Sequence, residues 1–171
     1  MTEYQNRGEV FSALGIKFDL FEGIYGSGGW NGLCQFLELE RTPICCAVSR
    51  NHRLAGMKKL TMQDLNGEYL VMPVEGVSKE IDAFRKDVTE HYPTVQIVDS
   101  PYYGVDTFTL CEMNDYILVT QPVYADIHSN LMTIPLETNY TLPYGLMYAK
   151  EPTSASRKFI NAIKEIKYGH L

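Results

Sequence analysis

Short blocks of apolar residues alternate with polar ones along the chain, and this spacing predicts a series of strands. Strands are expected over 17–25 (KFDLFEGIY), which GSGG then ends, over 33–40, where Leu33, Gln35, Leu37 and Leu39 alternate with Cys34, Phe36 and Glu38, and over 43–49 (PICCAVS). The same pattern predicts further strands at 69–74, 94–100, 116–123, 131–137 and 144–150. The last two flank the turn-rich stretch TNYTLP.

Apolar residues at helical spacing predict the intervening helices. Thr61 and Asp64 form a weakened capping box before a short helix that Gly67 ends, and Ile81, Phe84 and Val88 lie on one face of a helix over 78–91. A helix is expected over 105–115 with Asp106 as its N-cap, and a short helix or turn over 124–130. The last expected helix is capped by Thr153 or Ser154. Its apolar face consists of Phe159, Ile160, Ile163 and Ile166.

From residue 69 onward, strands and helices alternate. This order predicts an α/β protein with a mostly parallel sheet that is covered on both faces. Ligands of such sheets bind beyond the carboxyl ends of the strands. The corresponding turns here are 75–78, 100–104 and 121–124.

Composition and charge narrow the classes of function. The hydrophobic fraction of 45% is that of an ordinary globular protein, and the net charge of −6 with no basic cluster argues against nucleic-acid binding by these residues. No apolar run is long enough to span a bilayer, so no membrane association is expected. The first residues, MTEYQNRGEVFSALG, lack the features of a secretory signal, which favours a cytoplasmic protein.

The four cysteines and the histidines are the first candidates for chemistry. Cys45 and Cys46 lie in an apolar run, and Cys111 lies on a predicted helix with no resolving partner nearby, so we expect free thiols that pack in the core. The spacing of CxxC-type metal sites is missing, and His52 is interpreted as a hydrogen-bonding turn residue. No metal or cofactor is expected, and the glycines of GSGG lack a dinucleotide fingerprint.

The turns after the strands offer better candidates. Ser78 begins a helix, so it can act as a simple N-cap or help to bind an anion at the helix N-terminus. Tyr102 and Tyr103 can line a pocket or pack a loop. Both alternatives stay open for each of these positions.

The stretch 44–73 has a more specific pattern. An apolar strand is followed by Asn51-His52-Arg53-Leu54-Ala55, a basic dipeptide and a segment that runs from Leu60 to Glu68 as LTMQDLNGE. This succession resembles the effector-binding domain of LysR-type transcriptional regulators, although the family commonly has proline where this chain has Arg53. KFDLFEG (17–23) and LPYGLMYAKEPTSASRKFINAIKE (142–165) resemble two further parts of that domain, so the likeness covers about residues 17–166.

The resemblance implies a periplasmic-binding-protein-like fold of type 2, in which two Rossmann-like subdomains are joined by crossing strands. Residues 45–134 would form the second subdomain, and 1–44 with 135–171 a partial first subdomain that includes the hinge strands. From the resemblance we expect a chain truncated at its N-terminus, without the family's opening β-α-β stretch and without its winged helix-turn-helix, through which alone DNA would be bound. We expect a homodimer or higher homo-oligomer in the full-length protein.

The implied function is that of a non-enzymatic bacterial sensor that binds a small-molecule effector in the cleft between subdomains. The positions that the resemblance assigns to effector binding are Gly76, Val77, Ser78, Ser100, Tyr102, Tyr103, Pro122, Val123, Glu22 and Tyr25. Two alternatives stay open: a solute-binding protein of a transport system with the same fold, and an enzyme with Cys45 or Cys111 as nucleophile.

Overall fold

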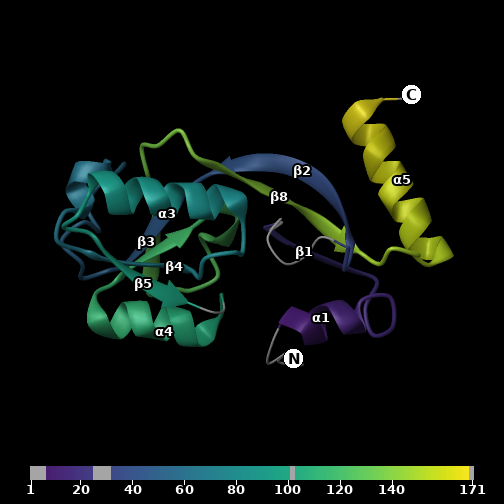
Figure 1. Cartoon of the computed structure of the whole chain (residues 1–171), viewed down its shortest axis with the longest axis horizontal. Helices are drawn as coiled ribbons and strands as arrows, with labels where there is room; N and C mark the ends of the chain where they lie inside the picture. The colour runs from purple at the N-terminus through teal and green to yellow at the C-terminus, as the bar shows by residue number, and fades with distance from the viewer. Residues whose placement is uncertain (1–6, 25–31, 101–102, 170–171) are drawn as a thin grey trace. The chain divides into compact units, whose positions relative to one another are not determined.

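The structure is a computed structural model, and it describes residues 7–24, 32–100 and 103–169. Its elements are, in order, α1 (Arg7–Ala13), β1 (Leu20–Ile24), β2 (Gln35–Pro43), β3 (Cys45–Ser49), η1 (Met62–Leu65), β4 (Tyr69–Pro73), α3 (Lys79–His91), β5 (Gln96–Ser100), α4 (Val105–Asn114), β6 (Ile117–Thr120), η2 (Pro122–Tyr124), β7 (Leu131–Pro135), β8 (Thr141–Tyr148) and α5 (Ser154–Tyr168), where η marks a 3₁₀ helix. Figure 1 shows their arrangement.

The chain divides into two compact units. Unit 1 comprises Met1–Arg41 with Pro143–Leu171, and unit 2 comprises Thr42–Leu142. Both boundaries fall inside strands, because β2 and β8 each begin in one unit and end in the other, and they are neighbours in one sheet. The α/β class and the two strands that cross between subdomains are therefore confirmed.

Unit 2 has a five-stranded sheet in the order β5-β4-β6-β3-β7 among the described residues. β4 is parallel to both β5 and β6, whereas β3 is antiparallel to β6 and β7. The predicted β-α-β succession from residue 69 produces the parallel part. β3 lies between β6 and β7 and is antiparallel to both, so the sheet is mixed. The local sequence pattern did not predict this position of β3.

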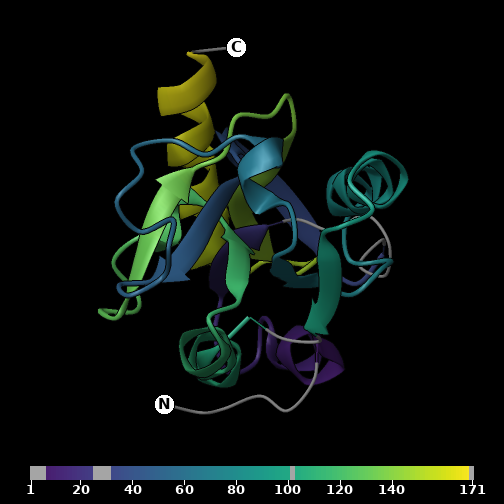
Figure 2. The ribbon, with the colours of Figure 1, turned by 90° about the vertical axis from the view of Figure 1, so that its left-hand side faces the viewer.

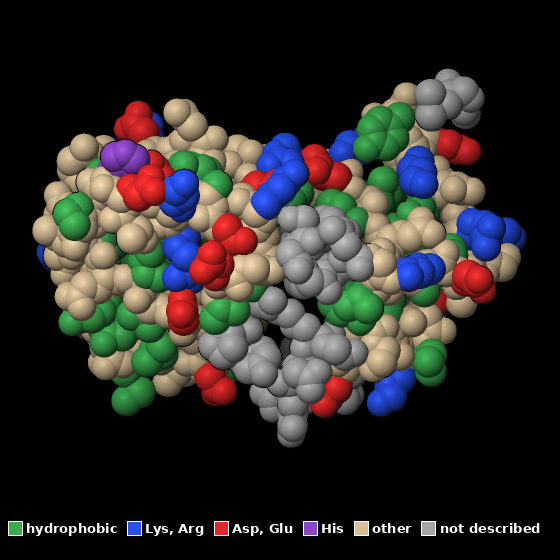
Figure 3. All heavy atoms as spheres, in the orientation of Figure 1, with side chains coloured by type: hydrophobic (Ala, Val, Ile, Leu, Met, Phe, Trp, Pro, Cys, Tyr) green, Lys and Arg blue, Asp and Glu red, His purple; other side chains and the backbone are tan. Residues whose placement is uncertain are grey.

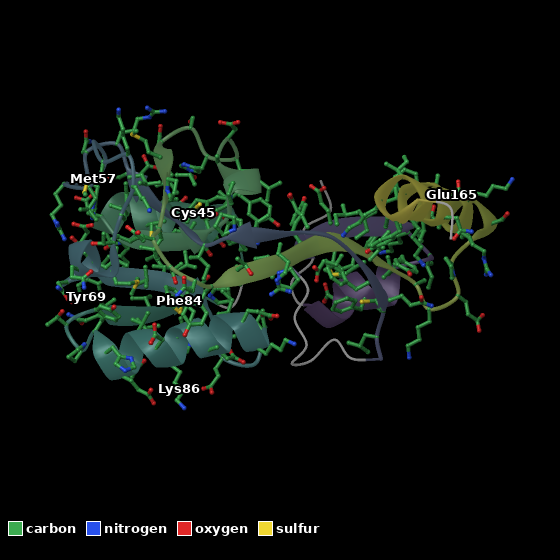
Figure 4. The ribbon with its side chains drawn as sticks, turned by 90° about the horizontal axis from the view of Figure 1, so that it is seen from above. Cys45, Met57, Tyr69, Phe84, Lys86 and Glu165 are labelled. Carbon is green, nitrogen blue, oxygen red and sulfur yellow. The ribbon has the colours of Figure 1, made fainter. Side chains whose placement is uncertain are left out.

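Helices cover both faces of this sheet, as Figures 1 and 2 show. α3 buries Ile81, Phe84 and Val88, as their spacing predicts, and the ring of Phe84 meets that of Tyr140 at a centroid distance of 5.4 Å. In Figure 4 Phe84 points from α3 toward the sheet and Lys86 points away from it. On the other face α4 packs through a cluster of buried residues: Ala47, Val71, Phe108, Cys111, Leu118 and Leu131.

Unit 1 has a sheet in the order β1-β8-β2 among the described residues, and β1 and β8 are antiparallel. The side chains of consecutive residues in a strand point to opposite faces of the sheet. Met147 accordingly packs with Leu14, just after α1, whereas Tyr148 packs with Ile160 of α5. The two helices thus cover different faces of the sheet.

The start of α5 is fixed by a small polar network. Thr153 accepts a hydrogen bond from the Ser156 backbone N–H at 3.2 Å, which confirms one of the two predicted caps. The hydroxyls of Thr153 and Ser156 both donate to the Asp19 carboxylate, at 2.9 and 2.8 Å. These bonds attach the segment before β1 to the helix that covers its sheet.

Four predicted details are wrong for local reasons. The helix α4 has Gly104 as its N-cap, so Asp106 lies in its first turn instead. The strand predicted over 116–123 ends at Thr120, because Pro122 cannot donate to a ladder and begins η2. The turn expected over 138–143 gives way to β8 at Thr141.

The apolar face predicted for the last helix is the fourth detail. Ile160 is buried and Ile163 packs beside it, but Phe159 and Ile166 are 50% and 86% exposed. Residues at i, i+4 and i+7 form a narrow stripe. Ser156, Ile160 and Ile163 satisfy that spacing, and Phe159 and Ile166 lie beside the stripe.

Candidate functional site

Three turns of unit 2 meet at one edge of its sheet, beyond the carboxyl ends of the parallel strands. Pro73 of β4 is level with Ser100 of β5, and Val71 is level with Leu118 of β6. Three residues further along, Val74 has left β4 for the first turn and Gln121 has left β6 for the third turn. Neighbouring strands of a sheet are about 4.8 Å apart, so the three strands reach this edge side by side.

The first turn leads from β4 into α3. Gly76 has φ +86°, a left-handed conformation that favours glycine, and its N–H donates to both carboxylate oxygens of Asp82, at 3.0 and 3.2 Å. Val77 and Ser78 are buried. Ser78 is the N-cap of α3 by backbone position, but its hydroxyl donates to Glu80 at 2.9 Å and does not cap the helix.

The second turn leads from β5 into α4, and its predicted residues separate. Ser100 is buried, and its hydroxyl shares a 2.8 Å hydrogen bond with that of Thr107. Tyr103 directs its hydroxyl to Thr120 at the end of β6. Burial of this hydroxyl raises the pKa of Tyr103 above its ordinary value. Tyr102 lies outside the described residues.

The ring of Tyr103 belongs to an aromatic cluster below this turn. Its centroid is 5.2 Å from that of Phe108 and 5.0 Å from that of Tyr124, and Phe108 lies 5.5 Å from His128. These rings line a cavity of about 10 Å³, the space of about one water molecule. Tyr103 therefore packs against Phe108 of α4 and Tyr124, in addition to lying in the second turn.

The third turn, after β6, holds two predicted residues and one that the sequence did not single out. Pro122 and Val123 lie in η2, and Val123 is 43% exposed. Gln121, immediately before them, is completely buried. Its amide nitrogen donates to the Thr42 hydroxyl, and its amide oxygen has no hydrogen-bond partner among the residues that the structure describes. A glutamine between a buried strand and a proline is the signal that could have identified it.

The two remaining predicted positions belong to unit 1. Glu22 is exposed on β1, opposite Leu146 of β8. Tyr25 lies outside the described residues. The described edge of unit 2 therefore brings together Gly76, Val77, Ser78, Ser100, Tyr103, Pro122 and Val123, and adds Thr107, Thr120, Gln121 and Thr42.

The cysteines have the properties of packing residues. All four are free and buried, which confirms the prediction. Burial raises the pKa of Cys34, Cys45 and Cys46, and it raises the pKa of Cys111 to about 12. An activated nucleophile requires a lowered thiol pKa, so these shifts are opposite to those of a catalytic cysteine.

His52 is buried in the turn after β3 and is used for hydrogen bonding. Its Nδ1 accepts from the Leu54 N–H at 3.2 Å, and its Nε2 lies 3.4 Å from the Glu68 carboxylate. Arg53 contacts the same carboxylate at 2.5 Å. Among the described residues no three His, Cys, Asp or Glu side chains are grouped so that they could hold a metal ion.

Comparisons with known proteins give a clear result at the level of structure. No family model and no curated protein matches the sequence. Among solved structures, the regulatory domain of CcmR from Synechocystis PCC6803, in complex with 2-PG, has a TM-score of 0.62 and 14% identity over 95% of this chain and 80% of that one. The effector-binding domain of QuiR, in complex with shikimate, has a TM-score of 0.64 and 19% identity over 97% and 80% of the two chains. CbnR, a LysR-family transcriptional regulator, has a TM-score of 0.66 and 13% identity over 96% and 58%.

This chain has the fold of a LysR-type effector-binding domain. That is the periplasmic-binding-protein-like fold of type 2, and the fold predicted from the resemblance is confirmed. Within the LysR-type fold, the edge formed by the three turns lies at the carboxyl ends of parallel strands, where open α/β sheets bind their ligands.

Proposed function

We propose that this protein is the effector-binding domain of a bacterial LysR-type transcriptional regulator, and that it binds a small molecule at the carboxyl edge of the unit 2 sheet. The observation that carries the proposal is the agreement between sequence and fold. The motif from Asn51 to Glu68 resembles this family, and nearly the whole chain superimposes on effector-binding domains.

The ligands of the similar structures support a sensing role. Structures of that fold hold 2-PG, shikimate and benzoate in CcmR, QuiR and BenM. Within the described ranges, two helices begin at the edge without a side-chain cap, since the Ser78 hydroxyl donates to Glu80 and the N-cap of α4 is Gly104. Uncapped helix N-termini leave backbone N–H groups for a ligand.

The proposed site consists of Gly76, Val77, Ser78, Ser100, Tyr102, Tyr103, Pro122 and Val123, together with Glu22 and Tyr25. Such a sensor works when the effector binds one conformation or assembly better than another. In the proposed regulator the protein acts as a homodimer or higher homo-oligomer in the cytoplasm, and a winged helix-turn-helix domain outside these residues binds DNA. The proposal includes no catalytic step.

The alternative is a solute-binding protein of a transport system with the same fold. The regulators among the similar structures favour sensing over transport. No helix among the described residues has the length and apolar character that crossing a bilayer requires. The gene sequence upstream of Met1 separates the two hypotheses, because a helix-turn-helix coding region supports the regulator and a signal peptide supports the transport protein.

A thermal-shift screen tests the proposal directly. The library should contain small acids, amines, alcohols and sugars, each at a concentration of millimolar order. A ligand that binds the native state at 100 times its Kd stabilises it by about 2.7 kcal/mol, which gives a clear rise in Tm. If no compound raises the Tm and isothermal titration detects no binding, the sensor hypothesis is wrong.

A matched pair of serine variants locates the binding site. Ser78 is completely buried at the proposed edge, whereas Ser129 is exposed in the loop before β7. Ser78→Ala should weaken binding of the identified ligand by about tenfold, the worth of one hydrogen bond, and Ser129→Ala should leave its Kd unchanged. Equal affinities for the two variants would place the ligand elsewhere.

A further inference from the structure

Gln121 carries a hydrogen-bond acceptor that the fold leaves unused. Its side chain is completely buried, and its amide nitrogen donates to the Thr42 hydroxyl, while Oε1 has no hydrogen-bond partner within the described part of the chain. A buried carbonyl without a hydrogen bond is destabilising, and native proteins retain few of them. At a ligand-binding edge, such an oxygen can accept a hydrogen bond from a donor group of the ligand.

The position of Gln121 agrees with this use. It follows the last residue of β6, as Val74 follows the last residue of β4, so both residues lie where their strands enter the turns. Thr42, its partner, precedes β3, whose first residue Cys45 pairs with Thr120. Gln121 is therefore held from two strands at the same edge at which α3 and α4 begin.

The charges at this edge disfavour an anion. The first turn and the start of α3 carry Glu75, Glu80 and Asp82 against one cation, Lys79. Asp82 accepts the Gly76 N–H and Glu80 accepts the Ser78 hydroxyl, so both carboxylates are held close to the helix N-terminus.

Three further charged side chains, Asp106, Arg85 and Asp99, leave this edge acidic overall. Asp106 adds a carboxylate in the first turn of α4. The guanidinium of Arg85 donates to the Pro73 carbonyl at 2.6 Å and contacts Asp99 at 2.7 Å, while its buried Nε has no hydrogen-bond partner among the described residues. An anionic ligand would meet like charges here, and the favourable field of the α3 N-terminus is already offset by its own acidic residues.

We propose that the effector of this site is a hydrogen-bond donor without net negative charge, namely an amine or a polyhydroxyl compound, and that Oε1 of Gln121 accepts one of its hydrogen bonds. This inference rests on the proposed function and adds the chemical class of the ligand. It separates this protein from QuiR and BenM, whose bound shikimate and benzoate are carboxylates.

Matched ligand series test the class of the effector. The first series is benzylamine, benzyl alcohol and benzoate, and the second is glucosamine, glucose and gluconate, each titrated by isothermal calorimetry against the 171-residue protein. We expect a neutral or cationic member to bind at least tenfold more tightly than the carboxylate of the same series. Binding of a carboxylate with equal or higher affinity overturns the inference and leaves the sensor proposal intact. If no member of either series binds, the inference fails, and the broad screen above decides the sensor proposal separately.

A double variant tests the role of Gln121. Thr42→Val with Gln121→Met replaces both hydrogen-bonding partners by apolar groups of similar size, which is close to neutral for folding. The affinity for the donor ligand should fall by about tenfold in this variant. Gln96→Met, the same change at the exposed amino end of β5, is the matched control and should leave the affinity unchanged.

A pair of glutamate variants tests the effect of charge. Glu80→Gln keeps an acceptor for Ser78 but removes a carboxylate from the edge, whereas Glu90→Gln makes the same change near the far end of α3. Glu80→Gln should weaken amine binding by severalfold and improve carboxylate binding, and Glu90→Gln should change neither. If the double variant and Glu80→Gln both bind the donor ligand like the wild type, Gln121 holds only an internal water and the inference is wrong.

Discussion

Replacing Gly145 by alanine should destabilise unit 1 strongly. Gly145 lies in β8 opposite Gly23 of β1, and a Cβ built on it would overlap the backbone carbonyl of Leu37. The same Cβ would lie 2.9 Å from two ring carbons of Phe36, closer than real Cβ atoms approach. A side chain could rotate away, but the carbonyl belongs to strand β2 and moves only with its backbone.

The magnitude follows from the cost of overpacking. Inserting a methyl group into a packed interior costs about 1–3 kcal/mol, and a clash with backbone belongs at the upper end of that range. We therefore expect Gly145→Ala to lower the free energy of unfolding by about 3 kcal/mol. Gly56→Ala is the matched control, because no atom of the described residues lies within 4 Å of a Cβ built at Gly56.

The measurement must distinguish the two units. Urea denaturation followed by circular dichroism gives the free energy of unfolding, and amide hydrogen exchange shows which strands lose protection. Loss of protection should be concentrated in β1, β2 and β8, with β4 to β6 unaffected. A Gly145→Ala protein within about 0.5 kcal/mol of the wild type would refute the close approach of β8 to β2.

Three further predictions concern burial and charge. All four thiols should react slowly with a thiol reagent at pH 8 in the folded protein, because they are buried and their pKa values are raised; fast labelling of Cys111 would revive the nucleophile hypothesis. The hydroxyl and the N–H of Thr61 donate to the Asp64 carboxylate and lower its pKa from the ordinary value of 3.8. Asp64→Asn should therefore lower the free energy of unfolding by its full amount above pH 3.8, and by less as the pH falls through the lowered pKa. Urea titrations at several pH values measure this dependence. Arg85→Met should cost about 1–3 kcal/mol in the same assay, because it removes the charged bonds to the Pro73 carbonyl and Asp99, and an unchanged midpoint would show that these bonds are dispensable.

Unit 2 has exposed hydrophobic side chains on its surface. Figure 3 shows them gathered over α4, where Val105 and Met113 are 68% and 79% exposed. The sequence alone predicted α4 as a helix but gave no sign of this distribution, since its apolar residues are spread around the helix. Exposure depends on which side of α4 the sheet covers, and that is a property of packing.

The sequence by itself determined the local elements and the three turns at the sheet edge. Helical spacing of Ile81, Phe84 and Val88 and the capping residues Thr61 and Thr153 depend on neighbours in the chain, and the structure confirms them. The fold followed from the resemblance of an ordered set of motifs. These elements can be predicted from the sequence because they depend only on the types and spacing of residues that are close in the chain.

The tertiary structure alone decided which groups meet across long separations. The orphaned oxygen of Gln121 depends on Thr42, 79 residues earlier, and the need for glycine at 145 depends on the carbonyl of Leu37. The insertion of β3 between β6 and β7 likewise joins strands far apart in the chain. Hydrogen-bond satisfaction and steric fit are properties of pairs in space, so a pattern along one chain does not record them.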